Sequence, residues 1–154
     1  MVEKTLSVPA IQEGTVIDHI IPGSALKIIR LLRLSENNRQ VTVGLNLKSP
    51  SLGNKDLIKV TNFFLSPEHA EQIAIFSPNS TVNVIENYLV VKKFCVDMPK
   101  EISGTLQCPN PRCITGHEKI KSRFFVEENE EKVSLLCFFC EKSFSRNEAG
   151  EFLW

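Results

Sequence analysis

Four cysteines in two close pairs constrain the last third of this chain more than any other feature. Cys108 and Cys113 enclose four residues, Cys137 and Cys140 enclose two, and 23 residues separate the pairs. Two turns that each offer two thiolates can close a tetrahedron around Zn²⁺. In such turns, backbone N–H groups point at the sulfurs and help to hold their negative charge. The spacing therefore predicts one structural zinc, because four protein ligands leave no open position for catalysis.

The predicted cellular compartment favours a metal site, and not disulfides, as the role of the four cysteines. The first 14 residues lack the basic-then-apolar layout of a signal peptide, and no apolar run approaches the ~20 residues that a membrane helix needs. We therefore expect a cytoplasmic chain with no membrane partner, in which clustered thiols favour a metal. Iron is the alternative metal, although the spacing matches neither common ferredoxin pattern. Cys95 lies outside the cluster and is predicted to be a small buried hydrophobe.

A boundary near residues 97–104 divides the chain of 154 residues. This stretch carries Pro99 and Gly104 and separates a region of regular apolar patterning from the cysteine-rich one. The sequence predicts two domains, residues 1–98 and 99–154. The second is too small to bury much apolar surface, so its folding is expected to depend on the metal.

Apolar periodicity predicts an α+β fold for the first domain. Strands are expected at residues 15–20, 41–47 and from 57, and a strand pair or one kinked strand at 81–93; a polar loop is expected at 48–55. Helices are expected after Ser24 and after Ser66-Pro67-Glu68, where a cap, a proline and an acid coincide. The order βαββαβ is the ferredoxin-like pattern, followed here by a small β-rich zinc-ribbon domain. Residues 6–11 are a candidate for an additional edge strand.

Charge argues against a nucleic-acid partner. Basic and acidic residues number 18 each, and residues 101–154 hold an acidic excess of two. A zinc with four thiolates adds further negative charge, so this domain repels phosphate backbones. The acidic run at 127–131 is expected to be a solvated hairpin loop. A protein interface and core packing both remain open for five aromatic residues: Phe138, Phe139, Phe144, Phe152 and Trp154.

The sequence contains no phosphate loop, dinucleotide-binding glycine motif, zinc-protease motif or nucleophile elbow. His69 is expected to be a surface or capping residue and His117 a loop residue. The pair Asp18-His19 is a candidate for ligand binding together with Lys59 and Lys93. Lysines with a histidine can hold a polyphosphate, and an aspartate can accept from ribose hydroxyls. The alternative for these residues is a solvated strand edge.

Several ordered motifs resemble the regulatory chain of aspartate carbamoyltransferase. They span nearly the whole chain: GTVIDHI at 14–20, VGLNL at 43–47, KDLIK at 55–59, TVNVIENY at 81–88, CPNPRC at 108–113 and CFFCEK at 137–142. The resemblance implies a noncatalytic subunit with an N-terminal effector domain that binds CTP or ATP. It implies a C-terminal zinc domain that docks on the catalytic chain and couples nucleotide levels to the carbamoyl-transfer step of pyrimidine biosynthesis. Regulatory dimers would bridge catalytic trimers, giving a dodecamer of two catalytic trimers and three regulatory dimers.

The resemblance also assigns roles to residues by motif. In the nucleotide site, His19 and Lys93 would contact phosphates, and Asp18 and Lys59 the ribose region. Lys55 would serve a second, metal-bridged nucleotide. The remaining members of the site are Ile11, Ile85, Tyr88 and Val90 around the base, with Asn83 beside them.

The resemblance places Asn110, Glu141 and Lys142 against the catalytic chain, together with Arg112 and Phe139. Two of these depart from the family pattern, since Arg112 replaces a small polar residue and Phe139 a tyrosine; both changes bear on the strength of docking. Pro9 stands where the family often has an acidic residue near the base. Proline has no N–H to donate, so this change bears on base selectivity.

Overall fold

Two antiparallel sheets and two helices make up the fold. The computed structural model describes residues 9–130, 132–146 and 148. The N-terminal part contains β1 (Gly14–Ile20), α1 (Ala25–Leu31), β2 (Val41–Ser49), β3 (Gly53–Thr61), α2 (Pro67–Phe76), β4 (Thr81–Glu86) and β5 (Leu89–Cys95). The C-terminal part contains β6 (Glu101–Ser103), the short 3-10 helix η1 (Ile114–Gly116), β7 (Arg123–Asn129), β8 (Lys132–Cys137) and β9 (Ser143–Ser145).

The first sheet has the strand order β2-β3-β1-β4-β5. Its first four strands, with the two helices in their places in the chain, follow the ferredoxin-like pattern, so the predicted fold class is confirmed. The region predicted as a strand pair or one kinked strand is a pair, because Asn87 and Tyr88 turn the chain with φ values of 50° and 66°. This pairing adds β5 as an outer strand.

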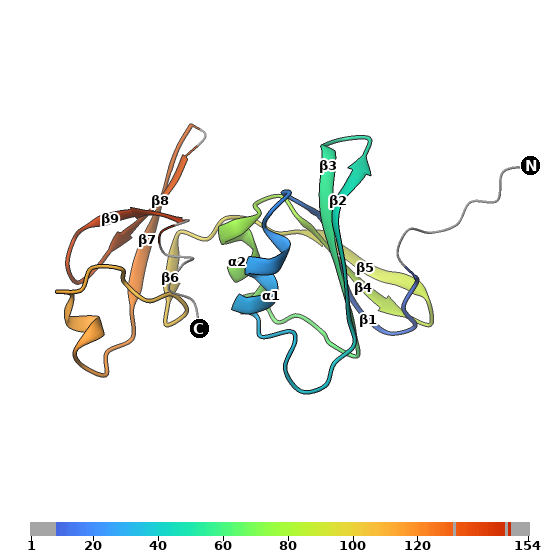
Figure 1. Cartoon of the computed structure of the whole chain (residues 1–154), viewed down its shortest axis with the longest axis horizontal. Helices are drawn as coiled ribbons and strands as arrows, with labels where there is room; N and C mark the ends of the chain where they lie inside the picture. Colours follow the sequence, from blue (N-terminus) through green and yellow to red (C-terminus); the bar gives the residue numbers. More distant parts are fainter. Residues whose placement is uncertain (1–8, 131, 147, 149–154) are drawn as a thin grey trace, which may run out of the picture.

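Alternation along the strands divides the sheet into two faces. Ile17 is paired with Ile58 on one side and with Val82 on the other, and all three are fully buried on the face that the helices cover. Both helices lie between the two sheets of the molecule, and the opposite face of the first sheet is left open (Figure 1). Gly14 starts β1 with a φ of 141°, and a Cβ there would lie 2.0 Å from the Val60 carbonyl oxygen, so only glycine fits.

The two helices begin with different caps. At α2 the Ser66 side chain accepts from the His69 backbone N–H, and the Ser66 N–H donates to His69 Nδ1, which confirms His69 as a capping residue. At α1 the buried Asp56 carboxylate of β3 accepts from the backbone N–H groups of Gly23 and Ala25. The start of α1 is therefore fixed by a neighbouring strand.

The second sheet has the strand order β6-β7-β8-β9. Ile102, Phe124 and Leu135 are buried in it, and they belong to one apolar cluster that continues into the core of the first domain. Glu127, Glu128 and Glu130 are exposed, as expected for a solvated acidic run, but only Glu130 lies in the β7–β8 turn. Glu127 and Glu128 were expected in the hairpin loop and instead belong to β7, where they pair with Ser134 and Val133; Glu131 lies outside the described residues.

Four predictions about local structure require correction or lie partly or wholly outside the described residues. The loop expected at 48–55 is mostly strand, since β2 and β3 continue to a turn at residues 50–52. Residues 9–11 of the candidate edge strand are irregular, and residues 6–8, Phe152 and Trp154 lie outside the described residues. Cys95 was predicted to be buried but is exposed, because it ends the outer strand β5.

Within the residues that the structure describes, no helix is long and apolar enough to cross a membrane.

Candidate functional site

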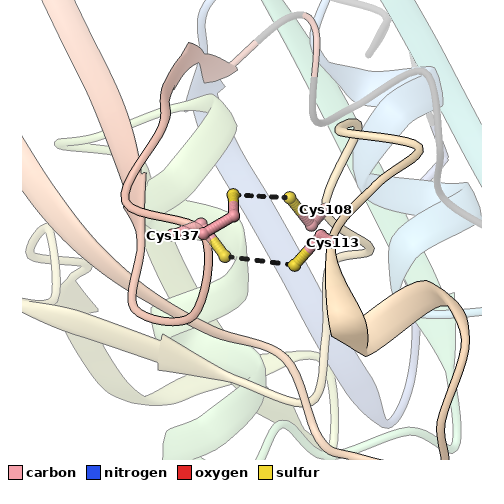
Figure 2. Close-up of side chains that lie close together, drawn as sticks. Cys108, Cys113 and Cys137 are labelled. Carbon is pink, nitrogen blue, oxygen red and sulfur yellow. Dashed lines mark hydrogen bonds between the residues drawn. The ribbon is translucent and has the colours of Figure 1, made fainter.

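The four clustered cysteines come from two separate segments of the second domain. Cys108 and Cys113 lie in the loop before η1, Cys137 ends β8, and Cys140 lies in the turn that leads to β9. Figure 2 shows Cys108 and Cys113 on one side and Cys137 on the other, with their sulfur atoms facing each other. The Sγ atoms of Cys108 and Cys140 are 3.7 Å apart, and those of Cys113 and Cys137 are 3.8 Å apart.

These distances fit a zinc tetrahedron. A regular tetrahedron with Zn–S bonds of about 2.3 Å has edges of about 3.8 Å. All four Sγ atoms lie within 4.8 Å of one another, and three of the four cysteines are buried. The four residues therefore form one structural zinc site, as the spacing predicted.

Hydrogen-bond donors surround the sulfurs. Backbone N–H groups reach three of them: Asn110 donates to Cys108, Phe139 and Cys140 to Cys137, and Lys142 to Cys140. These contacts confirm that the turns point N–H groups at the ligands.

The thiols differ in pKa because burial and hydrogen bonds oppose each other. Burial raises the pKa of Cys108 and of Cys137 above the usual thiol range. At Cys140 burial acts in the same direction, but hydrogen bonds led by the Asn110 side chain lower its pKa to about 7. The Thr115 hydroxyl lies 3.1 Å from Cys113 Sγ, in position to donate to a thiolate. Neither Asn110 nor Thr115 was identified by sequence as a partner of the sulfurs.

An apolar surface adjoins the metal site. Ile114, Phe138 and Phe139 have exposed fractions of 44%, 46% and 37%, and the two phenylalanine rings meet edge to face. The Arg123 guanidinium lies over the Phe138 ring at 4.7 Å. Among the predicted docking residues, Arg112, Phe139, Glu141 and Lys142 are exposed and Asn110 is half-buried.

The open face of the first sheet carries a cavity of about 640 Å³. Eight of the ten residues predicted for nucleotide binding line it: Asp18, His19, Lys55, Lys59, Asn83, Ile85, Val90 and Lys93. Four further residues line it: Val16, Leu47, Lys48 and Leu57. Ile11 and Tyr88 lie outside this lining, and Tyr88 is 63% exposed in the turn between β4 and β5.

Irregular pairing brings these side chains together. The register of β1 against β3 shifts between Ile17 and Ile20, and His19 has a φ of 56°. Neighbouring residues of a regular strand point to opposite faces, but this bulge lets Asp18 and His19 line the same cavity. A second shift, between Val84 and Ile85, places both Val90 and Lys93 of β5 on the open face.

The cavity holds a network of charges. Lys55 Nζ lies 2.8 Å from Asp18 Oδ1, and the His19 backbone N–H donates to the same oxygen at 2.7 Å. Burial acts to raise the pKa of Asp18, but these contacts outweigh it and hold the pKa below its usual value. Lys59 Nζ donates to the Pro9 carbonyl oxygen at 2.7 Å, and burial lowers the pKa of Lys59 despite the opposing charge of Asp18.

Comparison of the sequence with known proteins identifies the family to which this chain belongs. Residues 6–97 match the model of the aspartate carbamoyltransferase regulatory chain, allosteric domain, and residues 100–150 match that of the metal binding domain of the same chain. The chain belongs to the aspartate carbamoyltransferase regulatory chains. Relatives with that name include proteins from Vibrio parahaemolyticus, 45% identical over 97% of both chains, and Chromobacterium violaceum, 47% identical over 96% of this chain and 97% of the relative. The relative from Photorhabdus laumondii is 49% identical over 92% of both chains.

Membership of this family confirms the resemblance drawn from the motifs. The chain is a regulatory, noncatalytic subunit of aspartate carbamoyltransferase with an allosteric and a metal-binding domain. A regulatory chain implies a catalytic chain as its partner.

Proposed function

We propose that this regulatory chain binds CTP and ATP in the open-face cavity and passes the effect to the catalytic chain through the zinc domain. One observation carries the proposal: basic side chains from four different strands converge on a single cavity. Lys48, Lys55, Lys59, Lys93 and His19 all line it. A cavity of about 640 Å³ is within the usual range for small-molecule sites.

The distribution of chemistry in the cavity matches a nucleoside triphosphate. Lys93 supplies positive charge for phosphates, since charge-assisted hydrogen bonds to phosphate are strong, and the His19 ring offers a further hydrogen-bonding group. Ile85 and Val90 face each other across β4 and β5 and offer an apolar wall for a base. Asp18, held ionised by Lys55, is an acceptor for ribose hydroxyls.

Calorimetric titration with CTP and with ATP tests this site. We expect Lys93→Ala to weaken binding about 10- to 100-fold, because a hydrogen bond to a charged group contributes about 1.5–3 kcal/mol. Lys92→Ala is the matched control, because Lys92 is the adjacent exposed lysine on β5 but lies outside the cavity lining. Equal affinities in the two variants would place the nucleotide elsewhere.

The zinc domain is proposed to dock on the catalytic chain. Phe138 and Phe139, whose rings are in contact, are exposed beside Cys137 and Cys140, and the exposed Ile114 follows Cys113, so apolar side chains surround the four cysteines as expected at the centre of a protein interface. Arg112, Glu141 and Lys142 supply polar groups around it. Chelation of the zinc should therefore release the catalytic trimers in active form, measured by sedimentation and activity. A complex that stays intact after complete zinc loss would contradict the docking proposal.

The outer strand β5 is proposed to form the regulatory dimer. Leu89, Val90 and Val91 are 68%, 56% and 53% exposed on a strand with one unpaired edge, which is a template for pairing with a second copy. Three such dimers between two catalytic trimers would give the dodecamer. We also place the complex in the cytoplasm, where thiols stay reduced and available to zinc.

A further inference from the structure

Three buried serines meet where the end of α2 touches the loop between β1 and α1. The Ile21 backbone N–H donates to Ser77 Oγ at 2.9 Å, and the Ser24 hydroxyl donates to the Phe76 carbonyl oxygen at 3.1 Å. The Ser80 hydroxyl lies 2.6 Å from Ser77 Oγ and 2.9 Å from the Ser77 carbonyl oxygen. Ser77 and Ser80 are fully buried and Ser24 is 8% exposed. We call Ser24, Ser77 and Ser80 the serine junction.

The serine junction is next to the cavity at one end. Thr81 directly follows Ser80, and its Oγ1 lies 3.2 Å from His19 Nδ1. His19 lines the cavity, and the chain passes from it through Ile20 to Ile21, the donor to Ser77. A ligand that moves the His19 ring or backbone therefore acts two residues from the junction.

The other end of the serine junction leads to the zinc domain. The Val96 backbone N–H donates to the Ser80 carbonyl oxygen at 2.9 Å, and Val96 is the last buried residue before the segment that enters β6. Earlier in α2, the Gln72 side chain donates to Thr105 Oγ1 at 3.1 Å, across the boundary between the domains. The orientation of α2 and the exit of β5 thus both bear on the position of the zinc domain.

A route of this kind is needed because α1 and α2 lie between the first sheet and the zinc domain (Figure 1), whereas the residues that line the cavity lie on the other face of that sheet. The sheet face toward the zinc domain is covered by α1 and α2, so an effect of the cavity on that domain must pass through the sheet and the helical layer. The serine junction lies where β1 ends and the chain crosses to the helical layer.

We propose that Ser77 is a positioning residue for regulation, which holds the end of α2 to the β1–α1 loop so that ligand binding at His19 changes the orientation of the zinc domain. The proposal rests on the proposed nucleotide function of the cavity. Ser80 supplies the discrete alternatives that coupling requires, because its single hydroxyl hydrogen has two acceptors, Ser77 Oγ and the Ser77 carbonyl oxygen. A ligand shifts such an equilibrium only by binding the two arrangements with different affinity.

The test uses the complex of the full regulatory chain with its catalytic chain. CTP affinity is measured by calorimetry, and the regulatory response is the ratio of activities without and with saturating CTP. For Ser77→Ala we expect a CTP affinity within about twofold of wild type. We expect the regulatory response, the ratio of activities without and with CTP, to be about 2- to 30-fold smaller than in wild type. Ser35→Ala is the matched control, since Ser35 is an exposed serine of the same domain. It should leave both quantities unchanged.

The outcomes separate this inference from the proposed function. If the wild-type complex neither binds CTP nor responds to it, the proposed function fails and the inference fails with it. If the wild type responds and Ser77→Ala responds equally, only the inference is overturned, even when the variant unfolds at a lower urea concentration. Should Ser77→Ala not fold, Ser80→Ala decides in the same way, because it removes the two-acceptor hydroxyl and leaves the Ile21–Ser77 bond in place.

Discussion

The buried carboxylate of Asp56 connects three parts of the allosteric domain. Its Oδ2 accepts from the backbone N–H groups of Gly23 at 3.0 Å and Ala25 at 3.3 Å, and its Oδ1 accepts from Asn46 at 3.0 Å. Asp56 thereby ties the start of α1 and the irregular part of β2 to β3. Its side chain is fully buried, so water cannot replace a bond that is lost.

The substitution Asp56→Asn keeps the shape of the side chain but halves its accepting capacity. If the amide oxygen faces Gly23 and Ala25, the amide NH₂ faces the Asn46 N–H, and two donors oppose each other. One charge-assisted bond of about 1.5–3 kcal/mol is lost, and the two others weaken by about 1 kcal/mol each as they become neutral. We expect a total loss of about 3–5 kcal/mol, a large part of the ~5–15 kcal/mol that stabilises an ordinary domain.

Urea denaturation followed by circular dichroism measures this loss. With a slope of about 1–3 kcal/mol per molar urea, a loss of this size should lower the midpoint by roughly 1–5 M. Asp97→Asn is the matched control, because it makes the same chemical change at an exposed carboxylate. A loss below about 1 kcal/mol for Asp56→Asn would refute the reasoning, since it would mean that the three bonds contribute little.

Two further predictions concern a helix cap and the zinc site. The cap of α2 needs a neutral His69, because the Ser66 N–H donates to its Nδ1, and burial lowers the pKa of His69 despite the nearby charge of Glu68. The cap stabilises the fold by about 0.5–2 kcal/mol; this contribution is complete above pH ~6.5 and is lost as the pH falls through the lowered pKa of His69 in the folded state. The variant His69→Gln should therefore show a smaller change of the urea midpoint with pH. A pH dependence equal to that of wild type would disprove the role of His69 protonation in the cap. The variant Thr115→Val removes the hydroxyl that can donate to the Cys113 thiolate, so the zinc is held less firmly. Zinc should then transfer to a chromophoric chelator about 10- to 100-fold faster than from wild type. An unchanged transfer rate would exclude a role of Thr115 in holding the zinc.

Local patterns predicted the elements and the metal ligands of this protein. The cap, proline and acid at Ser66-Pro67-Glu68 predicted the start of α2, which begins at Pro67. The two cysteine pairs identified all four zinc ligands, because a turn with two thiolates is a local feature with few other uses. The order of strands and helices then sufficed for the fold class, since few topologies accommodate βαββαβ.

The details of the cavity depend on register, which has no local signature in this sequence. The bulge at Asp18-His19 exists only in the pairing of β1 with β3, so alternation alone would place the two side chains on opposite faces. Lys48 was expected in a loop and was not predicted to line the cavity, because β2 extends to Ser49 only through its pairing with β3. Its role and the roles of the other cavity residues in nucleotide binding stay predictions.

Burial of single residues was predicted least well. Cys95 is apolar enough for a core, yet it lies on β5, the outer strand of the sheet, where five of its six companions are also exposed. Whether a strand is central or outer depends on the topology of the whole sheet. The apolar pattern of residues 89–95 would suit a central strand as well as an outer one, so it does not predict their burial.

The placement of α1 and α2 between the two sheets has a consequence for how the assembled enzyme would sense its surroundings. The cavity residues lie on the sheet face opposite the helices, and the helices lie between that sheet and the zinc domain, so binding in the cavity would not require that domain to leave its partner. Sensing would then require no disassembly, and its speed would be set by dissociation of the effector itself. If the cavity binds nucleotides as proposed, such an enzyme would follow their changing supply without losing a subunit.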